Sequence, residues 1–236
     1  MTLYRTTHTL LSSDVDASRR LRLSTLFTML QEASIAHTTA LGMGRDKTLD
    51  RGLLWIITLQ QATIRRLPLY DETIELTSWP NPSMHLYFPR SYRITDANGT
   101  VLVEASALWA LMDRDTRRIV FPEEHGIAIE GAAFPDDPPL PRPLRLPVLE
   151  QAQSLVVPYS YTDLNGHMNN TRYFDLAEDR MPDALRMQSI QKIQAEYSAE
   201  ARANETITLR TFAEEHVFSM SGETDKRLFR LQLEYR

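Results

Sequence analysis

The chain has 236 residues, a hydrophobic fraction of 42% and a formal net charge of -5 at pH 7. Its length suits one large domain or two small ones, and its hydrophobic fraction is sufficient for a packed core. The acidic balance argues against nucleic acid as the main partner, because phosphate binding requires a basic surface, and the lack of cysteine excludes disulfide bonds and a cysteine nucleophile.

The sequence carries no targeting, membrane or cofactor signal. Its first six residues lack the apolar core of a signal peptide, and no run approaches the roughly 18 apolar residues of a membrane span. With no cysteine in the chain, we expect a cytoplasmic protein. The histidines have no metal-type spacing and no glycine-rich loop could hold a phosphate, so we expect neither a metal nor a nucleotide cofactor.

The first half of the chain reads as one strand, one long helix and four further strands. The helix is predicted at about residues 24–41, with Ser24 as its cap and Gly42 at its end. Its apolar residues recur at helical spacing, and they are Leu23, Leu26, Phe27, Leu30 and Leu41. The strands are predicted at residues 3–11, 53–65, 73–79, 85–94 and 101–112, with a tight turn at Asp96-Ala97-Asn98-Gly99 between the last two.

A proline-rich segment divides the chain. Between residues 134 and 150 prolines recur every few positions, and proline removes backbone donors and favours extended conformations. We therefore predict a semi-rigid connector at 134–150 between an N-terminal domain at 1–133 and a C-terminal domain at 151–236.

The second half repeats the order of elements found in the first. A strand is predicted at residues 155–159 and a helix at about 170–187, which Pro182 should break or restart. The later strands are predicted at residues 190–197, 206–212, 216–220 and 227–235. A long helix followed by an antiparallel meander suggests an α+β unit in which a sheet wraps around a helix, present here twice.

Most of the chemistry in the sequence is concentrated in residues 161–173. Asp163, Asn165 and His167 stand at alternate positions, and Asn169 and Asn170 follow at the start of the predicted helix. One interpretation is a turn followed by a helix cap, since Asp, Asn and Gly favour turns and Asn favours caps. The other is a catalytic site, because histidine exchanges protons near neutral pH and a carboxylate four residues before it could orient the ring or hold a water.

This motif resembles a known family signature. Asp-x-Asn-x-His-x-Asn-Asn before an aromatic-containing helix is similar to the active-site signature of acyl-acyl carrier protein thioesterases, the plant and bacterial enzymes that release fatty acids. Downstream, Glu196-Tyr197-Ser198-Ala199-Glu200-Ala201 resembles the Glu-Tyr-x-x-Glu-Cys segment of the family, with alanine in place of cysteine. Leu30-Gln31-Glu32-Ala33 and a strand that contains Trp55 extend the likeness into the first half. The resemblance implies a double hotdog fold and hydrolysis of fatty acyl thioesters.

The resemblance also suggests roles for the motif residues. His167 and Asp163 would activate the attacking water, or Asp163 would attack the thioester directly. Asn165 would orient the water or the thioester, and Glu200 would support the water network. The backbone N–H groups near Asn169 and Asn170 would face the oxyanion, because the first turn of a helix has unpaired donors.

The two halves are predicted to differ in chemistry. When Asp16 is aligned with Asp163, Ser18 takes the position of Asn165 and Arg20 that of His167. The first half therefore keeps the scaffold without the imidazole, and we expect it to shape the substrate site while the second half carries the chemistry. The predicted acyl pocket is lined by Leu26, Leu30, Trp55, Ile57 and Trp109.

The expected partner is an acyl carrier protein that carries a fatty acyl group on 4'-phosphopantetheine. Such carriers are acidic, so the docking face should be basic despite the net charge of the chain. Candidate patches are Arg65 with Arg66, Arg114 with Arg117 and Arg118, Arg142 with Arg145, and Arg172. The alternatives are an acyl-CoA thioesterase, a hotdog dehydratase and a non-catalytic acyl-binding regulator, and pairing of sheet edges could produce a homodimer.

Overall fold

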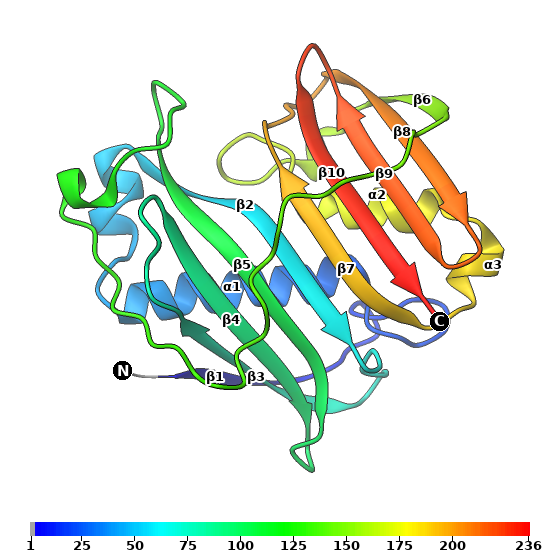
Figure 1. The fold of residues 1–236 in the computed structure, drawn as a ribbon, viewed down its shortest axis with the longest axis horizontal. Coiled ribbons are helices and arrows are strands. Elements are labelled where there is room, and N and C mark those ends of the chain that lie inside the picture. Colours follow the sequence, from blue (N-terminus) through cyan, green and yellow to red (C-terminus); the bar gives the residue numbers. More distant parts are fainter. Residues whose placement is uncertain (1–2) are drawn as a thin grey trace.

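The computed structural model describes residues 3–236, in which ten strands form one antiparallel sheet (Figure 1). The strands are β1 (Tyr4–Thr9), β2 (Leu53–Ile64), β3 (Thr73–Pro80), β4 (Tyr87–Asp96), β5 (Val101–Asp113), β6 (Gln151–Val156), β7 (Ile190–Tyr197), β8 (Thr206–Glu214), β9 (Val217–Glu223) and β10 (Arg227–Tyr235). Their order across the sheet is β1-β3-β4-β5-β2-β7-β10-β9-β8-β6. The α+β class predicted from the sequence is confirmed.

Each half of the chain contributes five adjacent strands with the same topology. The order β1-β3-β4-β5-β2 in the first half becomes β6-β8-β9-β10-β7 in the second, which is the same sequence of connections. The two half-sheets join where β2 pairs antiparallel with β7, from Leu59 opposite Glu196 to Thr63 opposite Lys192. With helical segments packed against each half-sheet, this arrangement is a double hotdog, as predicted.

The helices lie on one face of the sheet, with α1 against the first half and α2 and α3 against the second (Figure 1). They are α1 (Leu23–Ala40), α2 (Arg172–Arg180) and α3 (Asp183–Arg186). The rings of Phe27 and Phe174 stack at the contact between α1 and α2, with centroids 4.1 Å apart and planes 5° from parallel. None of the helices in residues 3–236 is long and apolar enough to cross a membrane.

The ends of the helices agree with the sequence analysis except at one cap. Helix α1 begins at Leu23, with Arg22 at its N-cap, and Ser24 lies inside the first turn, so the predicted Ser24 cap is wrong. At the other end Gly42 adopts φ +79° and its N–H donates to the Thr39 carbonyl, which ends the helix as predicted. The break predicted at Pro182 falls between α2 and α3.

The strands fall within a few residues of their predicted positions, with the largest shift at the start of the second half. Strand β6 occupies Gln151–Val156 and not residues 155–159. Pro158 ends the extended segment and precedes a 3-10 turn at Tyr159–Tyr161. The cause is that proline has no N–H to offer to a sheet.

The segment from 134 to 150 contains no helix or strand and crosses the face of the sheet opposite to the helices (Figure 1). The carbonyl of Pro139 accepts hydrogen bonds from Ser106 Oγ on β5, at 2.6 Å, and from Gln61 on β2. The Asp137 carboxylate accepts hydrogen bonds from Trp79 Nε1 and Asn81 Nδ2. The segment is therefore anchored along its path, while the domain boundaries assigned to it stay a prediction.

Candidate active site

A tight loop before α2 holds the first three motif residues. The Asp163 N–H donates to the His167 carbonyl at 2.9 Å, and the Gly166 N–H donates to the Asp163 carbonyl at 3.0 Å. The Asp163 carboxylate accepts the Asn165 N–H at 2.8 Å, and Gly166 adopts φ +76°, which glycine tolerates without strain. The interpretation of this segment as a turn is thus correct for its backbone. The same turn places Asp163 and His167 close together.

A second connection brings Glu200 to the histidine. The Met168 N–H donates to the Ala201 carbonyl at 2.7 Å, which ties the motif loop to the segment that follows β7. His167 Nε2 then lies 3.5 Å from Glu200 Oε2. The imidazole is largely buried, with 12% of its side chain exposed, whereas the Glu200 side chain is 33% exposed.

An arginine from the first half completes this cluster. Arg117 lies in the turn after β5 and forms an ion pair with Glu200. It adopts φ +57° in a turn whose first residue, Asp113, accepts hydrogen bonds through its carboxylate from Asp115 and Thr116. The sequence analysis treated Arg117 only as part of a surface docking patch. No local pattern could reveal its role, because it depends on how the two halves pack.

The positive charges near His167 favour its neutral form. Burial lowers the pKa of His167 below its usual value of 6.5, and the cations Arg117 and Arg202 lower it further. Asp163 and Glu205 oppose this effect, with smaller contributions. The imidazole is therefore neutral at neutral pH and can accept a proton.

We expect Arg117→Gln to move the acid limb of the pH–rate profile of the chain upward. The change removes a cation near His167 and leaves the Glu200 carboxylate unpaired, so both effects raise the pKa of the imidazole. A general base loses activity as pH falls through its pKa, so the variant should lose activity at a higher pH than the wild type. The profile of kcat/KM reports this shift. The exposed neighbour Arg118 provides the control variant Arg118→Gln, and a profile that moves equally in both variants contradicts the assignment.

The two asparagines at the helix entrance have different functions. Asn169 Oδ1 accepts hydrogen bonds from the N–H and hydroxyl of Thr171, both at 2.9 Å, and the Asn169 N–H donates to the Tyr161 carbonyl. Both the side chain and the backbone N–H of Asn169 are therefore engaged in the turn before α2, whose N-cap is Thr171. Within residues 3–236 the Asn170 N–H has no recorded acceptor, so it is the donor that remains open to a ligand.

The motif residues line a cavity of about 740 Å³ between the two halves. Its polar wall includes Asp163, Asn165, His167, Asn169, Asn170, Glu200, Arg117 and Arg202, together with Gln31 and Lys226. A second cavity of about 420 Å³ is lined mainly by the first half and is mainly apolar. Six residues line both cavities, so they adjoin one another, and these are Ile35, Leu54, Trp55, Trp109, Leu164 and Asn165.

The structure places three of the five predicted pocket residues on these cavities. Trp55 and Trp109 line both, and Ile57 lines the polar one. The prediction for Leu26 and Leu30 does not match the structure, because both lie in the hydrophobic core, at 0% and 4% exposure, and line neither cavity. Helical periodicity identifies an apolar face and does not distinguish a face on the core from a face on a cavity.

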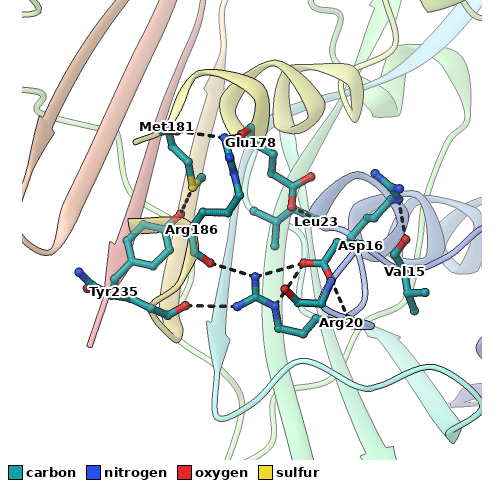
Figure 2. Close-up of polar contacts among 11 residues, drawn as sticks. Val15, Asp16, Arg20, Leu23, Glu178, Met181, Arg186 and Tyr235 are labelled. Atoms are coloured by element: carbon teal, nitrogen blue, oxygen red, sulfur yellow. Dashed lines mark hydrogen bonds and ion pairs between the residues drawn. The ribbon is translucent and has the colours of Figure 1, made fainter. Parts of the chain in front are cut away.

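The first half holds a counterpart of the motif loop (Figure 2). Asp16 accepts the Ser18 N–H at 2.8 Å, as Asp163 accepts that of Asn165, and its own N–H donates to the Arg20 carbonyl. Arg20 occupies the position of the histidine, where it pairs with Asp16 and donates to the carbonyls of Arg186 and Gln188 in the second half. This loop binds the two halves together and offers no imidazole.

Two hotdog units in one chain, with a neutral imidazole beside carboxylates at their junction and an apolar cavity next to it, define a double-hotdog protein with a candidate catalytic site. The comparison with known families agrees with this class. The N-terminal domain of acyl-ACP thioesterases matches residues 1–127, and the C-terminal domain matches residues 149–234. The chain belongs to the acyl-ACP thioesterase family.

Relatives and solved structures support this assignment. The chain is 27% identical to a chloroplastic palmitoyl-acyl carrier protein thioesterase of Cuphea hookeriana, over 84% of this chain and 52% of that protein. A dodecanoyl-acyl carrier protein hydrolase of Cinnamomum camphora is also 27% identical, over 78% of this chain and 52% of that protein. The chain thus spans about half the length of these curated relatives.

The fold is shared with solved structures along the whole chain. An acyl-ACP thioesterase of Bacteroides thetaiotaomicron superposes with a TM-score of 0.84 at 21% identity and covers 99% of this chain and 98% of its own. The 12:0-ACP thioesterase of Umbellularia californica superposes with a TM-score of 0.83 at 21% identity, covering 99% and 97%. At these identities the superpositions establish the double hotdog fold.

Proposed function

We propose that the protein hydrolyses a fatty acyl thioester carried by an acyl carrier protein and releases the free fatty acid. The observation that carries the proposal is the placement of His167, 3.5 Å from Glu200, on a cavity that adjoins an apolar one. The thioester would lie in the polar cavity with its acyl chain in the apolar cavity, so the first half would shape the substrate site. Relatives named for palmitoyl and dodecanoyl substrates support a saturated fatty acyl group.

The chemistry follows from the protonation state of the site. Neutral His167 removes a proton from water, whose oxygen bonds to the thioester carbon while the carbonyl electrons move to oxygen. The open Asn170 N–H stabilises this oxyanion. When the oxyanion collapses, the carbon–sulfur bond breaks, and the leaving thiolate takes the proton from His167. Asp163 lies in the same turn as His167, and Asn165 lines both cavities.

Native mass spectrometry distinguishes this activity from simple acyl binding. After incubation with a fatty acyl carrier protein, the enzyme should yield free acid and holo-carrier, with no thioester retained. A non-catalytic binder would keep the intact thioester, and that result would remove the proposal. Parallel incubations with acyl-CoA and a hydroxyacyl thioester would reveal an acyl-CoA thioesterase or a dehydratase instead.

The cations that border the polar cavity provide a docking surface for an acidic carrier. Lys226 is exposed and lines the cavity, whereas Arg66 and Arg172 of the predicted patches are engaged with Glu72 and Asp175. We expect Lys226→Glu to raise KM for the carrier-bound substrate by more than for acyl-CoA with the same acyl group. Lys192→Glu, on the sheet in strand β7, is the matched control. Equal losses with both substrates would argue against docking at Lys226.

A further inference from the structure

The two halves correspond residue by residue around the motif loop and its counterpart. The Leu21 N–H donates to the Pro68 carbonyl as the Met168 N–H donates to that of Ala201, and the Arg22 N–H donates to Asp14 as the Asn169 N–H donates to Tyr161. Counterparts also meet at the centre, where Phe27 stacks on Phe174 and Gln61 pairs with Gln194. The halves are thus related by an approximate two-fold axis.

This symmetry matches two further pairs of residues. Leu23, at the start of α1, is the counterpart of Asn170, just before α2. Glu178 on α2 is the counterpart of Gln31 on α1. On this correspondence, Gln31 stands relative to the entrance of α2 as Glu178 stands relative to the entrance of α1.

In the inactive half this pair is in contact. The Leu23 N–H donates to Glu178 Oε1 at 3.4 Å (Figure 2). A carboxyl oxygen from one half therefore accepts the hydrogen bond of the backbone N–H at the helix entrance of the other half. This contact gives the first N–H of α1 an acceptor from the other half, while the Leu26 N–H donates to the Arg22 carbonyl.

In the catalytic half the same positions are arranged differently. Both Gln31 and Asn170 line the polar cavity, and within residues 3–236 no hydrogen bond is recorded for the Gln31 side chain or for the Asn170 N–H. A carboxamide differs from a carboxylate in having an N–H₂ donor. Glu178 offers an acceptor to the N–H of Leu23. Gln31, at the equivalent place in the other half, can instead offer an N–H₂ donor beside the N–H of Asn170.

We propose that Gln31 is a catalytic residue whose Nε2 donates, together with the Asn170 N–H, to the carbonyl oxygen of the bound thioester. This inference rests on the proposed hydrolysis. The two donors come from different halves of the chain and converge on one acceptor, which carries a full negative charge once water has added to the carbon. The first half then contributes to the chemistry as well as to the acyl pocket.

The first test is the isosteric replacement Gln31→Met, which removes the donor and keeps the length of the side chain. We expect kcat to fall by about 10²–10³-fold, the usual loss for one oxyanion donor, with KM little changed. Gln31→Glu should fall at least as far, because a carboxylate would compete for the Asn170 N–H and repel the oxyanion. The symmetric change Glu178→Gln is the control and should keep wild-type kcat. A Gln31→Met enzyme with wild-type kcat overturns the proposal.

A second measurement reports the contact without turnover. In His167→Ala, the carbonyl stretch of a ¹³C-labelled acyl thioester should move to lower frequency on binding, because two hydrogen bonds polarise the carbonyl. Adding Gln31→Met should return part of that shift, and an unchanged band would overturn the role of Gln31. If wild-type protein released no fatty acid while the band still shifted through Gln31, the proposed hydrolysis would fail and the carbonyl contact would stand.

Discussion

Replacing His167 with alanine is expected to lower kcat for acyl thioester hydrolysis by about 10²–10⁴-fold, the range typical of a lost general base. The expectation rests on an imidazole that is largely buried, kept neutral by nearby arginines and placed 3.5 Å from Glu200. Binding of the acyl chain should persist, since His167 does not line the apolar cavity. Initial rates of fatty acid release measure the change.

A second histidine provides the matched control for this prediction. His216 lies in the turn between β8 and β9, with 57% of its side chain exposed and a hydrogen bond to Gln188. His216→Ala should retain wild-type kcat. Comparable rates in His167→Ala and the wild type, with the fold intact, would remove His167 from the mechanism.

Isotope labelling distinguishes the two roles open to Asp163, support of the attacking water and direct attack on the thioester. If Asp163 only supports the water, single turnover in H₂¹⁸O should place ¹⁸O in the fatty acid and none in the protein. If Asp163 attacks the thioester, it forms an anhydride, and attack of water on the Asp163 carbonyl carbon of that anhydride should leave ¹⁸O in the Asp163 carboxylate. Peptide mass spectrometry after one turnover distinguishes these outcomes.

Replacing Phe174 with alanine is expected to lower the free energy of unfolding by about 3–5 kcal/mol. Phe174 is fully buried and stacks on Phe27 where α1 meets α2, so its removal leaves a cavity at the contact between the two halves. Loss of the stacked pair contributes beyond the buried area. Chemical denaturation followed by circular dichroism measures the change.

Two further variants test whether this effect arises at the contact between the halves. Tyr159→Ala removes an aromatic ring that is 84% exposed, and it should change stability by less than about 0.5 kcal/mol. Phe27→Ala combined with Phe174→Ala should cost less than the sum of the single changes, because each ring already loses its partner in the single variants. A Phe174→Ala protein as stable as Tyr159→Ala would show that the stacked pair does not hold the halves together.

The order of the elements could be predicted because their signals are local. Helical spacing of apolar residues located α1, alternation and turn residues located most strands, and Pro182 marked the break after α2. The wrong predictions also came from local signals. Ser24 was predicted as a cap because it is a good capping residue, but the helix begins one residue earlier, at Leu23, so Ser24 lies inside its first turn. Leu26 and Leu30 were placed in the pocket because periodicity shows an apolar face and not its neighbour.

Part of the candidate site could be predicted from the sequence for the same reason. Asp163, Asn165 and His167 lie in one turn, so their proximity follows from their spacing. Glu200 could be connected to them only through a family resemblance, and the structure shows the physical link in the hydrogen bond from Met168 to Ala201. Arg117 was taken for part of a docking surface, because nothing near it in the chain indicates that it reaches Glu200.

The repeated order of elements and the turn that holds a carboxylate and an imidazole together could be predicted from the sequence, because both depend on neighbours within a few residues. Which half of the chain supplies each remaining group follows only from the way the two halves pack. Arg117 and Gln31 belong to the first half and reach the polar cavity because β2 pairs with β7 and α1 packs against α2. Contacts between residues so far apart in the chain depend on how the two halves meet, and no local periodicity encodes that meeting.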